Sequence, residues 1–178
     1  MSNATIAGTP RDLGRVLGLV QAHFPPGYGI ASAAGQLPRR LSGMHFDTVL
    51  EIGTLRGQSA IVLAHFADTV ITIDIVEQPE MREALELAGV ADRVIPIVVA
   101  SDAAKARVIS RLAFDLAFLD GNHSRDCVEV DFTITRRCGS VLFHDYPHAR
   151  WTGIREFVDT LPSDQTETDE VFAWWRAE

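Results

Sequence analysis

The 178-residue sequence has little cysteine, no long apolar run and no block of basic residues. Its two cysteines, Cys127 and Cys138, would lie roughly 16 Å apart on one helix, which is too far for a disulfide. No apolar run approaches the roughly 20 residues that span a bilayer. The formal net charge is −8, so the basic side chains that phosphate contacts require are scarce. These absences exclude a disulfide framework, a membrane-spanning protein and a typical nucleic-acid binder.

The amino terminus lacks the features of a targeting segment. Residues 1–5 carry neither a basic region nor an apolar stretch, so we expect a cytoplasmic protein. The shortage of lysine and arginine also argues against docking on anionic membranes. Apolar residues make up 47% of the chain, which is enough to bury one globular core.

Apolar strands alternate with helical stretches, which predicts a Rossmann-like α/β fold. We expect a doubly wound, mostly parallel sheet with helices on both faces, in a single domain. Residues 1–45 are predicted as an N-terminal helical cap and residues 46–178 as the ligand-binding domain. Strands are predicted at 47–52, 69–73, 94–99, 114–119, 140–143 and 171–175. Helices are predicted at 9–24, 32–41, 77–88, 102–112 and 152–161, with one more directly after Gly57.

The segment around residues 128–134 is ambiguous. Its apolar residues alternate with polar ones, which is strand periodicity. The flanking runs, however, look like buried parallel strands, and parallel neighbours need a crossover of a dozen or more residues. Val130 and Ile134 also fit one helical face together with the two cysteines. We therefore predict a helix.

Three predicted strands end in an aspartate, at Asp74, Asp120 and Asp145. The carboxyl ends of parallel strands meet at one edge of a sheet, and ligands bind in the crevice beyond that edge. A single aspartate after a strand is usually a helix cap or a turn residue. Three of them beside a glycine turn indicate a site for a polar ligand.

The glycine turn follows the first strand, over residues 51–59. Gly53 allows a tight turn, and Gly57 opens a helix whose free backbone N–H groups face an acceptor. The spacing is neither the dinucleotide GxGxxG nor a P-loop. Asp74 lies 21 residues beyond Gly53, a distance that suits a grip on ribose hydroxyls. Ser101-Asp102 ends the third strand, where it suits either an adenine amino group or a helix cap.

Five motifs in order along the chain resemble one enzyme family. They are Glu51-x-Gly53-x-x-x-Gly57-x-Ser59, Ile73-Asp74, Ser101-Asp102-Ala103, Phe118-Leu119-Asp120-Gly121-Asn122-His123-Ser124 and Phe143-His144-Asp145-Tyr146. From about Val49 to Val158 the chain resembles class I S-adenosylmethionine-dependent methyltransferases, and is similar to the bacterial small-molecule O-methyltransferase-like group. The resemblance implies methyl transfer from S-adenosylmethionine to a small molecule, at oxygen.

The resemblance also implies roles for individual residues. Asp74 would bind the ribose, Asp102 the adenine, and Asp120 would sit beneath the transferred methyl group. In metal-dependent relatives the acid at the Asp120 position joins two adjacent oxygen ligands after the fifth strand. Here that pair is His144-Asp145 or Asp145-Tyr146, which departs from the pattern and leaves Mg²⁺ at Asp120 and Asp145 an open question. The cofactor-binding residues implied are Glu51, Gly53, Thr54, Gly57, Ser59, Asp74, Ser101, Asp102 and Asp120.

His123 and His144 are the candidate general bases, because imidazole titrates near neutrality, and Asp145 is predicted beside them. Trp151 either walls a substrate pocket or packs beneath its own helix. Trp174 and Trp175 would face opposite ways on a strand, one in the core and the other under a helix or at a homodimer contact. Two alternatives to a methyltransferase remain: an NAD-dependent oxidoreductase, and a non-catalytic nucleotide-binding domain.

Overall fold

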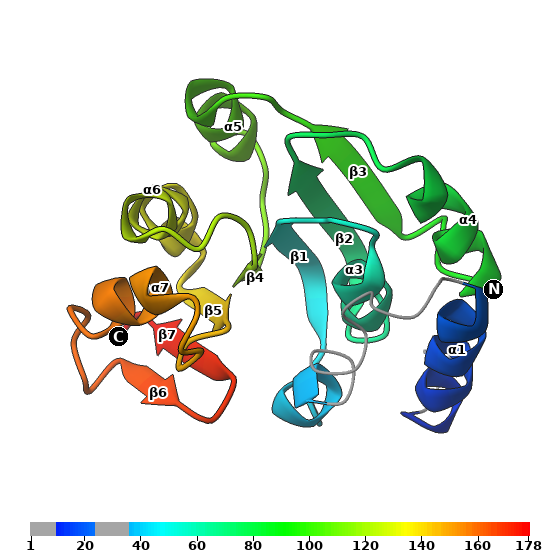
Figure 1. Ribbon diagram of the computed structural model, residues 1–178, viewed down its shortest axis with the longest axis horizontal. Coiled ribbons are helices and arrows are strands. Elements are labelled where there is room, and N and C mark those ends of the chain that lie inside the picture. Colours follow the sequence, from blue (N-terminus) through cyan, green and yellow to red (C-terminus); the bar gives the residue numbers. More distant parts are fainter. Residues whose placement is uncertain (1–9, 24–35) are drawn as a thin grey trace, which may run out of the picture.

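The computed structural model describes residues 10–23 and 36–178, and in this part of the chain a single sheet forms the centre of the molecule. The strand order is β3-β2-β1-β4-β5-β7-β6. Strands β1 to β5 are parallel, whereas β7 runs antiparallel to both of its neighbours, β5 and β6 (Figure 1). The strands are β1 (Phe46–Ile52), β2 (Ala67–Asp74), β3 (Val94–Val98), β4 (Leu116–Leu119), β5 (Ser140–His144), β6 (Thr166–Thr168) and β7 (Phe172–Arg176).

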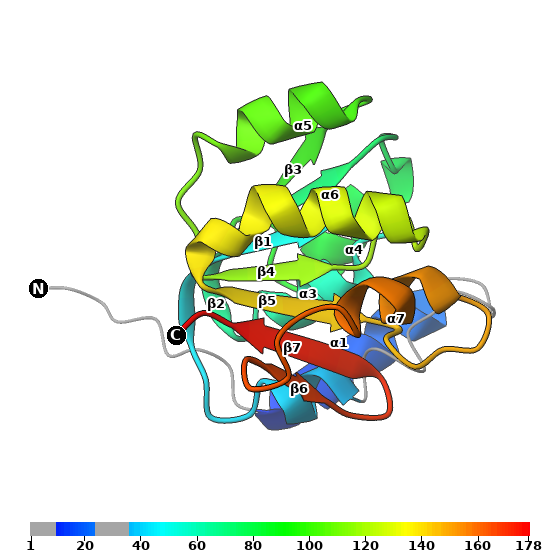
Figure 2. The same cartoon turned by 90° about the vertical axis from the view of Figure 1, so that its left-hand side faces the viewer.

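Helices cover both faces of this sheet, as predicted (Figures 1 and 2). One face carries α1 (Pro10–His23), a helical segment at residues 36–40, α3 (Gln58–Leu63) and α4 (Pro79–Leu87). The other carries α5 (Asp102–Ile109), α6 (Arg125–Thr135) with the 3₁₀ turn Arg136–Cys138, and α7 (Thr152–Val158). No helix within the described residues is long and apolar enough to cross a membrane.

Side chains alternate between two cores because successive strand residues point to opposite faces. In β1, Val49 packs with α3 and α4, whereas Leu50 and Ile52 pack with α5, α6 and α7. The central strands therefore carry apolar residues on both faces, as expected for a sheet covered on both sides. Leu13 and Leu37 belong to the first core, so the described part of the N-terminal region packs on the same sheet.

The ambiguous segment is helical, and α6 confirms that prediction. Its Phe132 is buried among three aromatic rings that come from β5, α7 and β7. The ring centroids lie 5.8 Å from Phe143, 5.3 Å from Phe157 and 5.0 Å from Trp175. Both cysteines are free, in agreement with the sequence.

The carboxyl-terminal part differs most from the prediction. Strand β6 was not predicted, and the final strand joins the sheet beside β5 in the antiparallel sense. The two adjacent tryptophans face opposite ways, as predicted: Trp174 is buried in the first core, and Trp175 packs under α6 against Phe132. Helices α5 and α7 each end three residues earlier than predicted. Residues 9, 24 and 32–35 of two predicted helices lie outside the described residues.

Candidate active site

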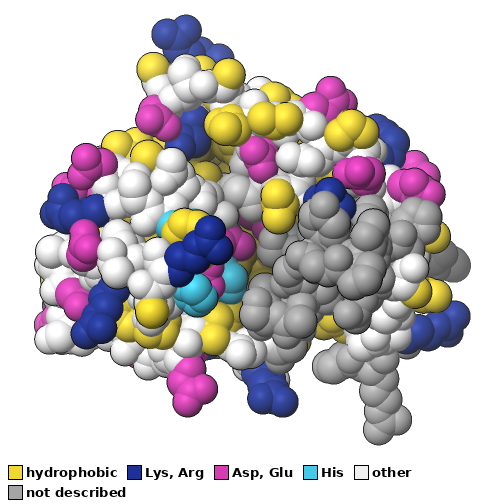
Figure 3. Space-filling view, viewed as in Figure 1, with side chains coloured by type: hydrophobic (Ala, Val, Ile, Leu, Met, Phe, Trp, Pro, Cys, Tyr) yellow, Lys and Arg dark blue, Asp and Glu magenta, His cyan; other side chains and the backbone are white. Residues whose placement is uncertain are grey.

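A large crevice opens at the carboxyl ends of the parallel strands, where the sequence placed a ligand site. Its volume is about 1200 Å³. Figure 3 shows histidine and acidic side chains gathered near the centre of this face. Among the described lining residues are six carboxylates but only two basic side chains, Arg56 and Lys105. The predicted site residues that line it are Gly53, Thr54, Ser59, Asp74, Ser101, Asp102, Asp120, His123, His144 and Asp145.

Two predicted residues, Glu51 and Gly57, are not among those that line the crevice. Glu51 is fully buried beneath the glycine turn. Gly57 stands at the N-cap of α3 with φ +80°, a conformation that favours glycine. Their roles in ligand binding therefore remain predictions, and any role of Glu51 must act through its neighbours.

The close approach of the end of β4 requires glycine at position 53. The φ of Gly53 is +99°, and a Cβ atom there would overlap the backbone carbonyl of Asp120 and lie 2.7 Å from the nitrogen of Gly121. The ends of β1 and β4 therefore approach so closely that a side chain cannot fit between them. This contact fixes the position of Asp120 relative to the glycine turn.

Asp74 holds the same turn from the other side. Its Oδ2 accepts a hydrogen bond from the backbone N–H of Leu55 at 2.8 Å, and its Oδ1 accepts one from Ile75 at 2.7 Å. Leu55 has a positive φ of 44°, so this bond stabilises an uncommon conformation. A carboxylate has about four acceptor sites, so Asp74 keeps capacity for a ligand in the crevice that it lines.

The third strand leads into a helix cap and an ion-pair cluster. Ser101 caps α5 by accepting a hydrogen bond from the backbone N–H of Ala104 at 3.3 Å. The next residue, Asp102, lies 3.0 Å from the Lys105 ammonium. Lys105 also makes a close ion pair with Asp131 of α6, so the pair ties two helices together at the crevice.

Sequence reasoning missed Lys105 and Asp131. Their side chains are only 14% and 6% exposed. Burial alone would lower the pKa of Lys105, but its hydrogen bond and charge pairing with Asp131 raise it. Both residues lie within helices, where sequence reasoning takes charged side chains as solvent-facing, and no local motif signalled that the two helices bring them together.

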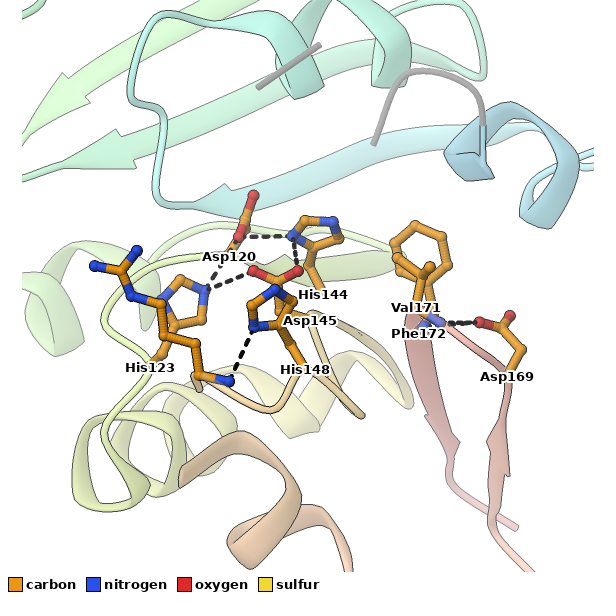
Figure 4. A network of polar contacts seen from close by, with 9 residues as sticks. Asp120, His123, His144, Asp145, His148, Asp169, Val171 and Phe172 are labelled. Atoms are coloured by element: carbon orange, nitrogen blue, oxygen red, sulfur yellow. Dashed lines mark hydrogen bonds and ion pairs between the residues drawn. The ribbon is translucent and has the colours of Figure 1, made fainter. Parts of the chain in front are cut away.

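Four predicted residues converge at the ends of β4 and β5 (Figure 4). The Nδ1–H of His144 donates to Asp120 Oδ1 at 2.9 Å and lies 3.6 Å from Asp145 Oδ1. His123 Nε2 lies 3.5 Å from both Asp120 Oδ1 and Asp145 Oδ2. The Nε2 atoms of both histidines are buried and have no hydrogen-bond partner in the described part of the chain. The sequence predicted this convergence correctly.

The charges in this cluster support one another. Burial opposes ionisation of Asp120, but its interactions with His123 and His144 outweigh that cost and lower the pKa of Asp120. Burial likewise disfavours the imidazolium of His144. The hydrogen bond to Asp120 and the charges of Asp120 and Asp145 outweigh that penalty, so the pKa of His144 is raised from its ordinary 6.5. The Asp120 carboxylate is therefore placed to stabilise an imidazolium that forms on His144.

Backbone strain and stacking hold the outer part of the cluster. Asp145 has a positive φ of 58°, which costs energy for a residue with a Cβ and is tolerated best by Asp and Asn. That turn directs its carboxylate back towards His123. Trp151 stacks on the His123 ring with centroids 4.9 Å apart. It lines the crevice, which agrees with the first of the two predicted alternatives, a wall of a ligand pocket. His148 lines the crevice too.

The same cluster is the candidate metal site among the described residues. Ligand atoms of Asp120, His144 and Asp145 lie within 4.8 Å of one another. The sequence left His144-Asp145 or Asp145-Tyr146 as the pair beside Asp120, and the structure brings the first of these pairs together with Asp120. A set with one nitrogen and two oxygen donors suits Mn²⁺ or Zn²⁺ better than Mg²⁺, which prefers oxygen.

Comparison with known proteins gives one family match. A family model described as a methyltransferase domain matches residues 50–146, which include the glycine turn and the three strand-end aspartates. A search of curated proteins finds no match. The comparison with solved structures returns several similar folds, all at low sequence identity.

Three solved structures cover nearly the whole chain. A putative O-methyltransferase from Klebsiella pneumoniae is 22% identical, with coverage of 98% of this chain and 93% of that one and a TM-score of 0.70. An O-methyltransferase from Bacillus cereus, in complex with SAH, is 20% identical, with coverage of 97% and 94% and a TM-score of 0.68. The O-methyltransferase TomG from Streptomyces achromogenes, involved in tomaymycin synthesis and solved with SAM, is 21% identical, with coverage of 98% and 93% and a TM-score of 0.65.

Proposed function

Because the chain belongs to the methyltransferase-domain family, we propose that it transfers a methyl group from S-adenosylmethionine to a hydroxyl of a small molecule. The observation that carries this proposal is the crevice itself. It joins the glycine turn, Asp74 and Asp102 to the histidine–carboxylate cluster in one continuous cavity. A donor and an acceptor can therefore lie end to end in it.

The donor fits along the first four parallel strands. We place the ribose at Asp74, whose carboxylate the turn already orients. The adenine lies near Ser101 and Asp102, and the methionine end lies at the glycine turn beside Thr54 and Ser59. Asp120 then faces the sulfonium, and its carboxylate is kept ionised by the two histidines.

The charge of the crevice supports a cationic donor. S-adenosylmethionine carries a positive sulfonium and a positive ammonium group, and the described lining has a clear excess of carboxylates. Such a lining raises the local concentration of a cation. A pyrophosphate-containing cofactor such as NAD would meet repulsion instead, which favours the methyltransferase over the oxidoreductase alternative.

The acceptor side needs a group that removes a hydroxyl proton and holds the oxygen in line with the methyl group. We propose that His144 takes this proton at Nε2, while its Nδ1–H is held by Asp120. A carboxylate that orients an imidazole in this way also stabilises the imidazolium that forms. His123, Asp145 and Trp151 form the adjoining wall and position the acceptor.

A divalent cation would be held by Asp120, His144 and Asp145, whose ligand atoms already converge. When bound, it would lower the pKa of an acceptor hydroxyl and neutralise the two carboxylates. The protein's own residues would still orient the donor and exclude water. Removing divalent cations with a chelator distinguishes a reaction that uses the imidazole alone from one that also needs a cation.

The first test is ligand binding. S-adenosylhomocysteine should raise the melting temperature, because a ligand that binds only the folded state stabilises it. Asp74→Asn removes the charged acceptor for the ribose and should weaken binding at least about tenfold, the effect of losing roughly 1.4 kcal/mol. Asp68→Asn on the same strand is the matched control, because that exposed carboxylate pairs with His45 far from the crevice.

The alternatives predict different results. Stabilisation by NAD together with none by S-adenosylhomocysteine would overturn the proposal in favour of an oxidoreductase. Binding of S-adenosylhomocysteine with no transfer of labelled methyl to any of a panel of hydroxylated small molecules would favour a non-catalytic domain.

A further inference from the structure

Glu51 is a fully buried carboxyl group that the proposed reaction does not use. It lies near the carboxyl end of β1, directly beside Thr72 of β2 in the sheet register. Both side chains face the core that contains α3 and α4. A buried carboxyl needs hydrogen bonds or a proton to be tolerated there.

A short chain of hydroxyl groups connects Glu51 to the crevice. Thr72 Oγ1 lies 2.5 Å from Glu51 Oε2, and Thr54 Oγ1 lies 2.5 Å from Thr72 Oγ1. Thr54 is 4% exposed and lines the crevice. The other oxygen of the carboxyl, Oε1, is buried without a hydrogen-bond partner among the described residues. The group is therefore only partly satisfied in this arrangement.

The surroundings of Glu51 favour its protonated form. Burial raises its pKa to about 8, although the hydroxyls of Ser59 and Thr72 act in the opposite direction. The charged groups that face it, Asp120 at the end of β4 and Asp74 at the end of β2, raise the pKa further. Near neutral pH most molecules with an empty crevice therefore carry a proton on Glu51.

The direction of the hydroxyl chain depends on that proton. When Glu51 is ionised, Thr72 donates to it and Thr54 donates to Thr72, so the Thr54 oxygen offers only lone pairs to the crevice. When Glu51 is protonated, it can donate to Thr72, and each hydroxyl in turn can point the other way. Thr54 then presents its hydrogen to the crevice and keeps only one free lone pair.

We propose that Glu51, Thr72 and Thr54 form a relay that binds the ammonium group of the donor's methionine end and releases one proton from Glu51 to solvent. This inference rests on the proposed function. An ammonium group has three donors and no acceptor, so it is bound best when Thr54 donates to Thr72 and offers both of its lone pairs to the crevice. Its positive charge also favours the ionised carboxyl behind the two hydroxyls. Glu51 and Thr54 are thus positioning residues for the donor.

Proton-linked calorimetry tests the relay. S-adenosylhomocysteine, which keeps the ammonium group, is titrated into the protein at pH 7 in buffers of different ionisation enthalpy. The wild type should release close to one proton per ligand bound. Its dissociation constant should fall between pH 6.5 and 8.5, by up to about tenfold per pH unit below the pKa of Glu51, because binding and proton release are linked. Glu51→Gln should bind without proton release and with little pH dependence.

A matched pair of variants tests the connection. Thr54→Val keeps the size of the side chain but removes the hydroxyl, so it should weaken binding and remove most of the proton release. Thr54→Ser keeps the hydroxyl and should restore both. Wild-type binding without proton release, or equal release from the Glu51→Gln variant, would overturn the relay. Failure of the wild type to bind S-adenosylhomocysteine at any of these pH values would overturn the proposed function instead.

Discussion

Replacing Gly53 by alanine tests how tightly the ends of β1 and β4 are joined. Two costs add at this position. A residue with a Cβ loses about 1–2 kcal/mol in the left-handed region that Gly53 occupies. The new Cβ would also lie 2.5 Å from the carbonyl carbon of Asp120, so backbone must move, and overpacking of this kind costs a further ~1–3 kcal/mol. We expect Gly53→Ala to destabilise the protein by about 2–5 kcal/mol in total.

Gly89→Ala is the matched control. Gly89 also has a positive φ, +68°, but nothing lies within 4 Å of a Cβ there, so only the conformational cost applies. Urea denaturation of both variants gives the difference in unfolding free energy, and titration with S-adenosylhomocysteine gives the affinity. Gly53→Ala should lose more stability and also bind more weakly, whereas Gly89→Ala should bind as the wild type does. Equal losses of stability would refute the close approach of the two strand ends.

Two further predictions concern the histidine–carboxylate cluster. Because the pKa of His144 is raised by folding, its contribution to stability is complete below the unfolded value of about 6.5 and is lost as the pH rises through the folded value. The stability difference between wild type and His144→Gln should therefore shrink between pH 6 and pH 9 in urea denaturation. The variant's turnover should fall by roughly 10²–10⁴ with little change in donor affinity, and unchanged turnover would reject His144 as the base. Removal of divalent cations with EDTA should leave turnover intact if the imidazole acts alone; loss of turnover that Mn²⁺ or Zn²⁺ restores would assign Asp120, His144 and Asp145 as ligands.

The fold could be predicted from the sequence wherever buried parallel strands alternate with helices. Such strands carry apolar side chains on both faces, and an aspartate marks the carboxyl end of three of them, β2, β4 and β5. The local periodicity of the α6 segment indicated a strand. Its helical structure could be predicted only from the crossover that two parallel strands require. Strand β6 is only three residues long and mostly exposed, so it carries no apolar signal from which it could have been predicted.

The candidate site could be predicted where its residues follow strands, because sheet geometry alone brings strand ends together. Asp120 and His144 are examples, and they form a direct hydrogen bond. Lys105 and Asp131 could not be predicted, because their meeting depends on how α5 packs against α6. The burial of Glu51 behind two threonines likewise depends on the register between β1 and β2, which the motif does not encode.

The excess of carboxylates along the crevice also affects what happens after the chemical step. In the proposed reaction the donor arrives with a positively charged sulfur and leaves as a neutral thioether, so the crevice attracts the incoming ligand more strongly than the outgoing one. The product should therefore dissociate more readily than the donor, which limits inhibition by accumulated product. Added salt screens this preference, and should bring the two dissociation rates closer together.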